Sequence, residues 1–193
     1  MPAARGRWHD PVLWAAAALF GAIAGASLAE PHRIAASAVL AAAMAAIAFE
    51  DLRRLRVPDF WNALAAIAGL GAAWFGAASV GAGPVAAVGA ALISMLICAG
   101  AFLLLREAFF RLRGVEGLGL GDVKLAATGG IWLGWETFAV AVALAAAGAL
   151  IWVAVQSASG AWTADRKIPF GAFLAPAIWA CWYASELAAA ATG

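Results

Sequence analysis

The chain has 193 residues, of which 66% are hydrophobic and only 12% are charged, with a formal net charge of +1. A soluble globular domain carries about a quarter charged residues, so this composition excludes an ordinary soluble protein. The small net charge and the lack of a basic stripe also argue against a nucleic-acid partner. With a mean hydropathy of +0.92, the chain is predicted to be all-α, a polytopic transmembrane helical bundle in a lipid bilayer.

Long apolar blocks between charged clusters predict about seven membrane spans. Blocks of about 20 residues match the ~30 Å hydrocarbon core of a bilayer. In chain order, the expected spans are 12–29, 34–50, 60–79, 84–105, 121–135, 137–156 and 169–189. The fifth is short and contains Gly129, Gly130 and Gly134, which indicates a helix buried against its neighbours rather than one facing lipid.

The first block has two interpretations. Arg5 and Arg7, an apolar stretch and then Ser27-Leu28-Ala29 are also the pattern of a cleaved signal peptide. Cleavage would leave six spans and would not change the later ones. Without cleavage, residues 1–11 are expected to form a short cytoplasmic N-terminus, and residues 1–193 a single membrane-embedded domain.

Basic residues predict the orientation of these spans. Of the 12 Lys and Arg residues, only Arg33 falls on one side of the membrane when seven spans are counted. The others all fall on the opposite side: Arg5, Arg7, Arg53, Arg54, Arg56, Arg106, Arg111, Arg113, Lys124, Arg166 and Lys167. The positive-inside rule makes that side cytoplasmic, as expected of an inner-membrane protein.

Two acidic residues stand out because of where the spans place them. Asp51 closes the second span and Asp122 opens the fifth, so both carboxylates are expected at the cytoplasmic level. Two neighbouring carboxylates can share one proton, which supplies a base to activate water and an acid to protonate a peptide carbonyl. The residues alone therefore indicate a membrane hydrolase or a transporter with two carboxylates. A single Asp at a span end is also a common helix cap.

Other chemistries have less support. His9 and His32 have no obvious nucleophile partner, which argues against a serine or cysteine mechanism. Cys98 and Cys181 lie singly in apolar blocks with no C-x-x-C pair. We therefore expect the two cysteines to be packing residues, and we expect neither a metal site nor a cofactor.

Glycines at 117, 119 and 121 precede Asp122. Backbone without side chains can approach a substrate closely, so this stretch is a candidate for binding an extended substrate segment by strand addition. A glycine cluster before a helix is also commonly only a turn. Lys124 follows Asp122 by two residues, and we expect it to reach the interface rather than to pair with Asp122.

Three further acids, Glu50, Asp59 and Glu116, lie near the two aspartates in the sequence. They are candidates for attracting a basic substrate segment, and they also fit ordinary solvated positions at span ends.

At these positions the sequence resembles the type IV prepilin peptidases, the GxGD-type membrane aspartyl proteases of bacteria. The segment from Asp51 to Val57-Pro58 is similar to the family's first catalytic segment. Gly119-Leu120-Gly121-Asp122-Val123-Lys124-Leu125, with Glu116-Gly117 before it, is similar to the second. Ile168-Pro169-Phe170-Gly171 resembles the C-terminal Pro-Phe-Gly element. The resemblance covers about residues 34 to 176, with the elements in the family's order.

The resemblance implies that Asp51 and Asp122 are the catalytic pair. It also implies removal of a short basic leader from type IV or Flp prepilins, usually after a glycine and just before the apolar helix. Residues expected to contact the substrate are Gly119, Gly121, Glu50, Glu116, Pro58, Asp59, Lys124, Pro169, Phe170 and Gly171. The chain resembles the short, peptidase-only form found with Tad/Flp pili, so no zinc domain, methyltransferase domain or methylation is expected. Asp59 departs from the Asn that the family often has there.

Two alternatives stay open. The signal-peptide-peptidase branch of the GxGD proteases would carry a Pro-Ala-Leu element, which this sequence lacks. A small proton- or cation-coupled transporter would place its acids near the bilayer midplane at a repeat interface, and no repeat is visible here.

Overall fold

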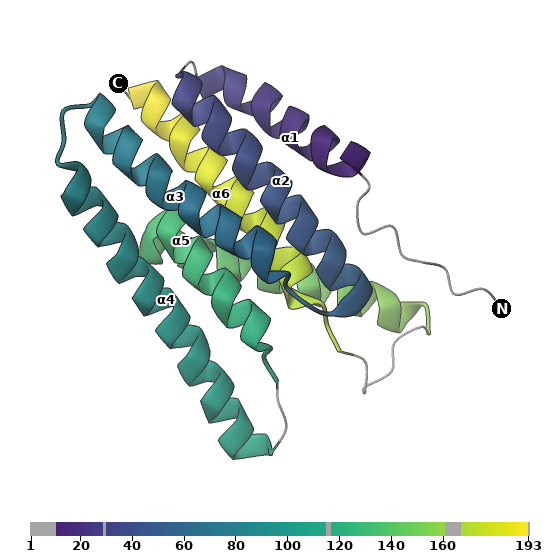
Figure 1. The fold of residues 1–193 in the computed structure, drawn as a ribbon. Coiled ribbons are helices and arrows are strands. Elements are labelled where there is room, and N and C mark those ends of the chain that lie inside the picture. The colour runs from purple at the N-terminus through teal and green to yellow at the C-terminus, as the bar shows by residue number, and fades with distance from the viewer. Residues whose placement is uncertain (1–10, 29, 115–116, 161–166, 193) are drawn as a thin grey trace.

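The computed structural model describes residues 11–28, 30–114, 117–160 and 167–192, and every regular element in these ranges is a helix. The all-α prediction is confirmed. The elements, shown in Figure 1, are α1 (Pro11–Gly25), the short 3₁₀ helix η1 (Ala26–Leu28), α2 (Pro31–Arg54), α3 (Asp59–Ser79), α4 (Pro84–Arg113), α5 (Leu120–Ala158) and α6 (Phe170–Thr192).

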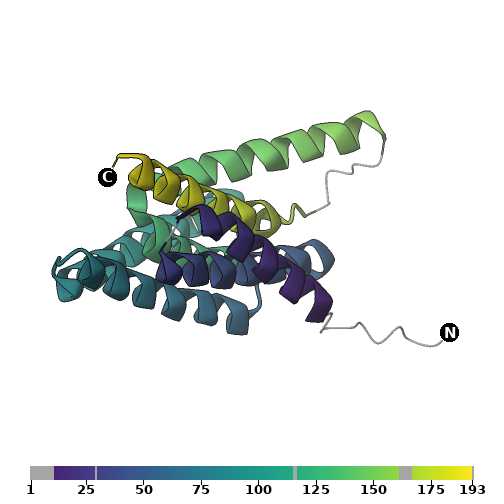
Figure 2. The same cartoon turned by 90° about the horizontal axis from the view of Figure 1, so that it is seen from above.

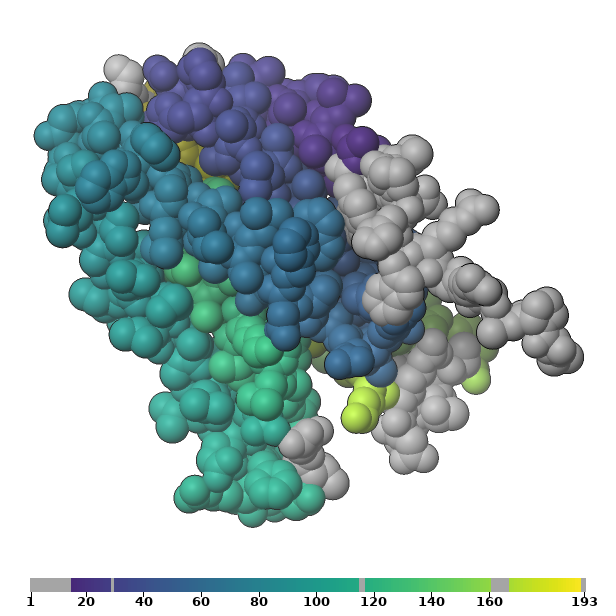
Figure 3. Space-filling model, in the orientation of Figure 1, coloured from purple at the N-terminus to yellow at the C-terminus, as the bar shows by residue number. Residues whose placement is uncertain are grey.

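Among the described residues, four helices, α2 to α5, are long and apolar enough to cross a membrane. Their outward faces carry large apolar side chains such as Ile67, Leu104 and Leu150, which are 70%, 73% and 69% exposed. Figure 3 shows one such face, formed by α3 and α4 with the start of α5 between them. Apolar surface of this extent is unfavourable in water but is the expected lipid-facing surface of a membrane bundle. The chain is therefore a multi-pass membrane protein.

The fifth and sixth predicted spans form one helical run, α5, that breaks at Gly134. This residue has φ 70 and ψ 166, a conformation that a residue with a side chain rarely adopts. Beyond the break the helix turns back beside α6, as Figure 2 shows, and the Trp152 ring lies 6.3 Å from that of Phe173. The run of 39 residues therefore folds into two antiparallel segments.

The first segment of α5 is buried, as predicted for the fifth span. Leu125 and Ala126 are fully buried there. A Cβ added at Gly130 would lie 2.6 Å from the backbone oxygen of Ser94, so α4 and α5 are in close contact at this point. α2 and α6 contribute the fully buried side chains Leu40, Met44, Ile47, Leu174 and Ile178 to the same core.

Basic residues gather at one end of the bundle. The end of α2, the end of α4 and the beginnings of α5 and α6 lie at this end, with the beginning of α2 and the end of α3 at the other (Figure 1).

The helix boundaries differ from the predicted span boundaries mainly in α4, which runs eight residues past the predicted end at 105, to Arg113. An ion pair between Arg111 and Glu107 at 2.7 Å accompanies this extension.

Candidate active site

Asp51 lies in the last turn of α2 and is only 5% exposed. Its Oδ2 atom accepts a hydrogen bond of 2.9 Å from the backbone N–H of Ala172, in the first turn of α6. The first N–H groups of a helix have no partner inside the helix, so they favour a negative group at this position. The helix ends at Arg54, three residues after Asp51, because Leu55 has a left-handed conformation (φ 53, ψ 45) and donates its N–H to the Asp51 carbonyl.

Asp122 lies in the first turn of α5 and is held by the glycine-rich segment before it. The N–H of Gly119 donates to Asp122 Oδ2 at 3.2 Å, and the N–H of Asp122 donates to the Gly119 carbonyl at 3.1 Å. This reciprocal pair is a capping box, which orders the start of the helix. Arg106 of α4 stabilises the same segment, because its Nε–H donates a hydrogen bond of 3.1 Å to the Leu118 carbonyl.

The two carboxylates meet at Gly171, in the first turn of α6. A Cβ placed on Gly171 would lie 3.0 Å from Asp51 Oδ2 and 3.4 Å from Asp122 Oδ1. The two oxygens are therefore no farther apart than the sum of these distances. The absence of a side chain at Gly171 leaves room for the pair.

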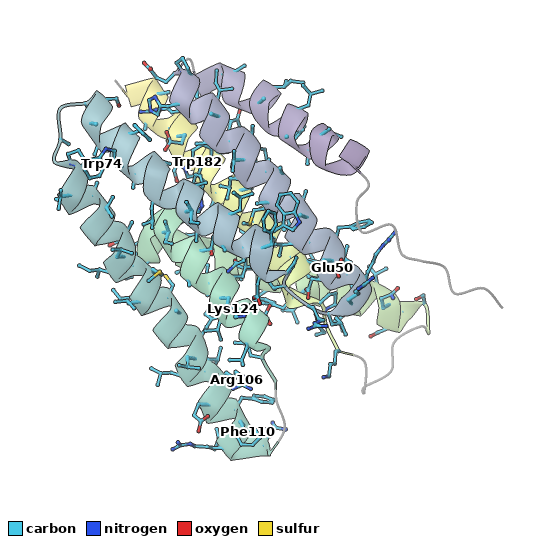
Figure 4. The ribbon with its side chains drawn as sticks, in the orientation of Figure 1. Glu50, Trp74, Arg106, Phe110, Lys124 and Trp182 are labelled. Atoms are coloured by element: carbon cyan, nitrogen blue, oxygen red, sulfur yellow. The ribbon has the colours of Figure 1, made fainter. Side chains whose placement is uncertain are left out.

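Both aspartates line one open cavity of about 270 Å³. Leu55, Arg56, Val57, Asp59, Gly119, Leu120, Gly121 and Lys124 complete its wall. The cavity holds acids from three helices and two basic groups, and its volume leaves room for water beside the aspartates. Figure 4 shows Lys124 at the start of α5 and Glu50 near the end of α2, on the two sides of this region.

The helical spacing predicts that Lys124 and Asp122 do not pair, and the structure confirms this. Its Nζ atom lies 2.6 Å from Oδ1 of Asp59, at the beginning of α3. One turn further along, the Asn62 amide donates to the Lys124 carbonyl at 3.2 Å and accepts from the Thr128 hydroxyl at 3.0 Å. These contacts fasten the start of α5, and with it Asp122, to α3.

The remaining predicted site residues fall into two groups. Gly119, Gly121, Asp59 and Lys124 line the aspartate cavity, and Gly171 separates the two carboxylates. The others do not line this cavity: Glu50, Pro58, Pro169 and Phe170. Glu116 lies outside the described residues.

The residues outside the cavity have contacts of their own. Glu50 forms an ion pair with Arg54 at 3.3 Å, one turn along α2. The Phe170 ring packs 6.5 Å from that of Phe102. Pro58 is the N-cap residue of α3, and Pro169 is buried just before α6.

Sequence reasoning missed several positioning groups. The Ala172 N–H, which holds Asp51, is a backbone group and leaves no signal in the sequence. Val57 packs against Gly121, where an added Cβ would lie 3.0 Å from the Val57 Cβ. Asn62 carried a detectable signal, since a polar amide within an apolar span is usually hydrogen-bonded.

Comparison with known proteins agrees with this geometry. A model of the type IV leader peptidase family matches residues 38–154, which include both aspartates. The chain belongs to this family.

Two similar proteins carry the name prepilin leader peptidase/N-methyltransferase. The one from Aeromonas hydrophila is 32% identical over 147 residues, covering 75% of this chain and 47% of the relative. The one from Burkholderia pseudomallei (strain K96243) is 47% identical over 68 residues, covering 35% of this chain and 22% of the relative. The chain thus spans about half or less of the length of these relatives. No solved structure matches it.

Proposed function

We propose that this protein is an aspartyl endopeptidase that removes the leader from type IV or Flp prepilins, with Asp51 and Asp122 as its catalytic pair. One observation carries the proposal: two carboxylates from separate helices converge under Gly171 on an open, water-accessible cavity. Membership of the type IV leader peptidase family supports the substrate class.

The chemistry follows from having two carboxylates side by side. Like charges at close range disfavour double ionisation, so one carboxylate is protonated and the other is ionised. The ionised group takes a proton from water, which attacks the peptide carbonyl carbon, while the protonated group gives its proton to the carbonyl oxygen. The tetrahedral intermediate then collapses, the C–N bond breaks, and the leaving nitrogen receives a proton from the pair.

Backbone groups position the two acids for this reaction. The Ala172 N–H holds Oδ2 of Asp51, and the Gly119 N–H holds Oδ2 of Asp122. In each case the other carboxylate oxygen is left for water or substrate. Because both backbone groups of Gly119 already serve Asp122, we assign Gly119 to positioning the acid rather than to pairing with a substrate strand.

The orientation of the protein in the membrane belongs to the same proposal. The aspartate cavity lies at the end of the bundle that carries Arg53, Arg54, Arg106, Arg111 and Arg113. The positive-inside rule supports a cytoplasmic position for this end, in the bacterial inner membrane. A prepilin anchored by its apolar helix would present the junction between leader and helix at this level.

The remaining substrate contacts are predictions of the same kind. Asp59 and Lys124 lie at the wall of the cavity and are mostly exposed, with side-chain exposures of 76% and 52%. An exposed ion pair is weak and exchanges readily with charges on a bound peptide. We propose that Asp59 attracts basic residues of the leader when substrate binds.

The decisive experiment uses the intact protein, purified and returned to lipid vesicles with a full-length prepilin. We expect the prepilin to lose its leader, with the cleavage site and any methylation read by mass spectrometry. Asp51→Asn and Asp122→Asn should each lower the cleavage rate at least about a hundredfold, since each removes a proton-transferring group. Glu136→Gln is the matched control, because Glu136 is an exposed acid on α5 just past its break.

Two results would contradict the proposal. Full cleavage by either aspartate variant would end the assignment of the pair. A folded wild-type protein that leaves several prepilins intact would overturn the substrate class, whatever the variants do.

A further inference from the structure

A second cavity, larger than the first at about 380 Å³, lies toward the opposite end of the bundle from the aspartates. It is lined by residues of α2, α3, α5 and α6, and neither aspartate is among them. Figure 4 shows the separation, with Trp182 of this cavity toward one end of the bundle and Lys124 of the aspartate cavity toward the other. Nothing in the proposed peptidase reaction uses this space.

One end of this cavity is charged. Arg33 of α2 and Glu186 of α6 form an ion pair there, with 2.8 Å between Nη1 and Oε2, and their side chains are 27% and 26% exposed. A guanidinium has five N–H donors and a carboxylate has two acceptor oxygens, so one ion pair does not use the full hydrogen-bonding capacity of either group. His32 also lines the cavity, and its buried Nε2 atom has no hydrogen-bond partner among the described residues.

The rest of the cavity wall is apolar and lacks bulk on one side. On α3 the lining residues are mostly glycine and alanine, among them Gly69, Ala72 and Gly76. Opposite them stand Trp132 and Trp182, whose rings meet edge to face at 5.5 Å. The cavity therefore combines a polar end that carries both signs of charge with an apolar wall.

We propose that this cavity binds one phospholipid whose headgroup carries both a phosphate and a primary ammonium. The phosphate would accept hydrogen bonds from Arg33, and the ammonium would donate to a carboxylate oxygen of Glu186. Charge-assisted hydrogen bonds of this kind are the strong ones, especially at the edge of a membrane. An acyl chain then lies along the glycine and alanine face of α3. This inference is independent of the peptidase reaction.

The position of the cavity suits a lipid rather than a soluble ligand. Arg33 and His32 are in the first turn of α2, a predicted membrane span, so they lie at the depth of the lipid headgroups. Arg33 is also the basic residue that stands apart from the cytoplasmic cluster predicted from the sequence. The site therefore faces the leaflet opposite the aspartates.

The test measures which lipids stay bound to the intact protein. The protein is placed in nanodiscs with equal amounts of phosphatidylethanolamine, phosphatidylcholine and phosphatidylglycerol, extracted gently, and analysed by native mass spectrometry. We expect phosphatidylethanolamine to be retained over the other two. Phosphatidylcholine has no N–H to donate to Glu186, and phosphatidylglycerol has no cation.

Two kinds of variant locate the site. Arg33→Gln and Glu186→Gln should each lower retention about tenfold, the effect of losing a charged hydrogen bond. The control is Arg111→Gln, which breaks the 2.7 Å ion pair with Glu107 at the far end of α4. Retention by this control should equal that of the wild type.

Two glycine substitutions on α3 test whether the apolar wall of the cavity holds the lipid. Gly76 lines the cavity and Gly71, on the same helix, does not. A Cβ added at either position meets nothing within 4 Å. Gly76→Leu should therefore displace the lipid, and Gly71→Leu should not. Equal retention of the three lipids, no retained lipid, or retention unchanged in both Arg33→Gln and Gly76→Leu would each overturn the proposal.

Discussion

Gly171→Ala tests the geometry of the two aspartates directly, because it adds one methyl group between them. That methyl carbon would lie 3.0 Å from Asp51 Oδ2 and 3.4 Å from Asp122 Oδ1. The first distance is closer than an ordinary contact, so the carboxylate must move by a few tenths of an ångström. Gly171 does not have a positive φ, so the effect of alanine is steric and not a matter of backbone strain.

The size of the expected effect follows from these contacts. Overpacking a buried position costs about 1–3 kcal/mol of stability. Misplacing a catalytic group by about 1 Å costs about a hundredfold in rate, so a smaller shift should cost about tenfold or more. We expect the hydrogen bond from the Ala172 N–H to Asp51 Oδ2 to lengthen first, because Ala172 directly follows residue 171, which carries the added methyl group.

Cleavage of a prepilin in vesicles measures this effect, with thermal unfolding in detergent as the check on folding. Gly100→Ala is the matched control, because an added Cβ there meets nothing within 4 Å. We expect Gly100→Ala to cleave normally and Gly171→Ala to cleave about tenfold more slowly or worse while remaining folded. Wild-type activity in Gly171→Ala would refute the reasoning that these two oxygens define the site.

Four further outcomes are expected. Trp132→Phe removes an indole N–H that donates to a carbonyl of α3 at 2.8 Å, so it should lower the unfolding free energy by about 1 kcal/mol; an unchanged unfolding curve would contradict this. Lys124→Ala breaks an exposed ion pair with Asp59 and should cost less than about 1 kcal/mol by the same measurement. Gly130→Ala places a Cβ 2.6 Å from the Ser94 backbone oxygen, so it should lower the unfolding free energy by about 1–3 kcal/mol. A smaller loss of unfolding free energy than in Lys124→Ala would count against the close packing of α4 and α5. A chelator should leave prepilin cleavage unchanged, since the proposed reaction uses only carboxylates and water; strong inhibition would indicate a metal-dependent hydrolase.

The order and approximate positions of the helices could be predicted from the sequence because apolar length is a direct requirement of the bilayer. Their number could not, since seven spans are expected and the fifth and sixth form one broken helical run, α5. A boundary between the predicted spans 121–135 and 137–156 lies next to Gly134, the residue at which α5 reverses. The end of α4 was not predicted, because apolar runs report membrane depth and not helix length. Leu112 and Arg113 continue the helix beyond the last predicted apolar residue.

That Asp51 and Asp122 lie at one level of the membrane could be predicted, since the topology places both there, but their distance from each other could not. How they are held could not be predicted either. Ala172 contributes only its backbone N–H, and Gly171 contributes only the absence of a side chain. The role of these two groups can be assigned only when the position of the start of α6 against the end of α2 is known.

The helices that carry the aspartates are joined by polar contacts to two different neighbours, while α5 also packs against α6 and α2 against α3. α2 and α6 are joined at one end by the hydrogen bond between Asp51 and Ala172 and at the other by the ion pair between Arg33 and Glu186. α3 and α5 are joined by the contacts of Lys124 and Trp132 with α3. Since Asp51 belongs to the first pair and Asp122 to the second, the distance between the carboxylates depends on how the pairs pack together. A change that moves one pair against the other therefore acts on the site even where it touches neither aspartate.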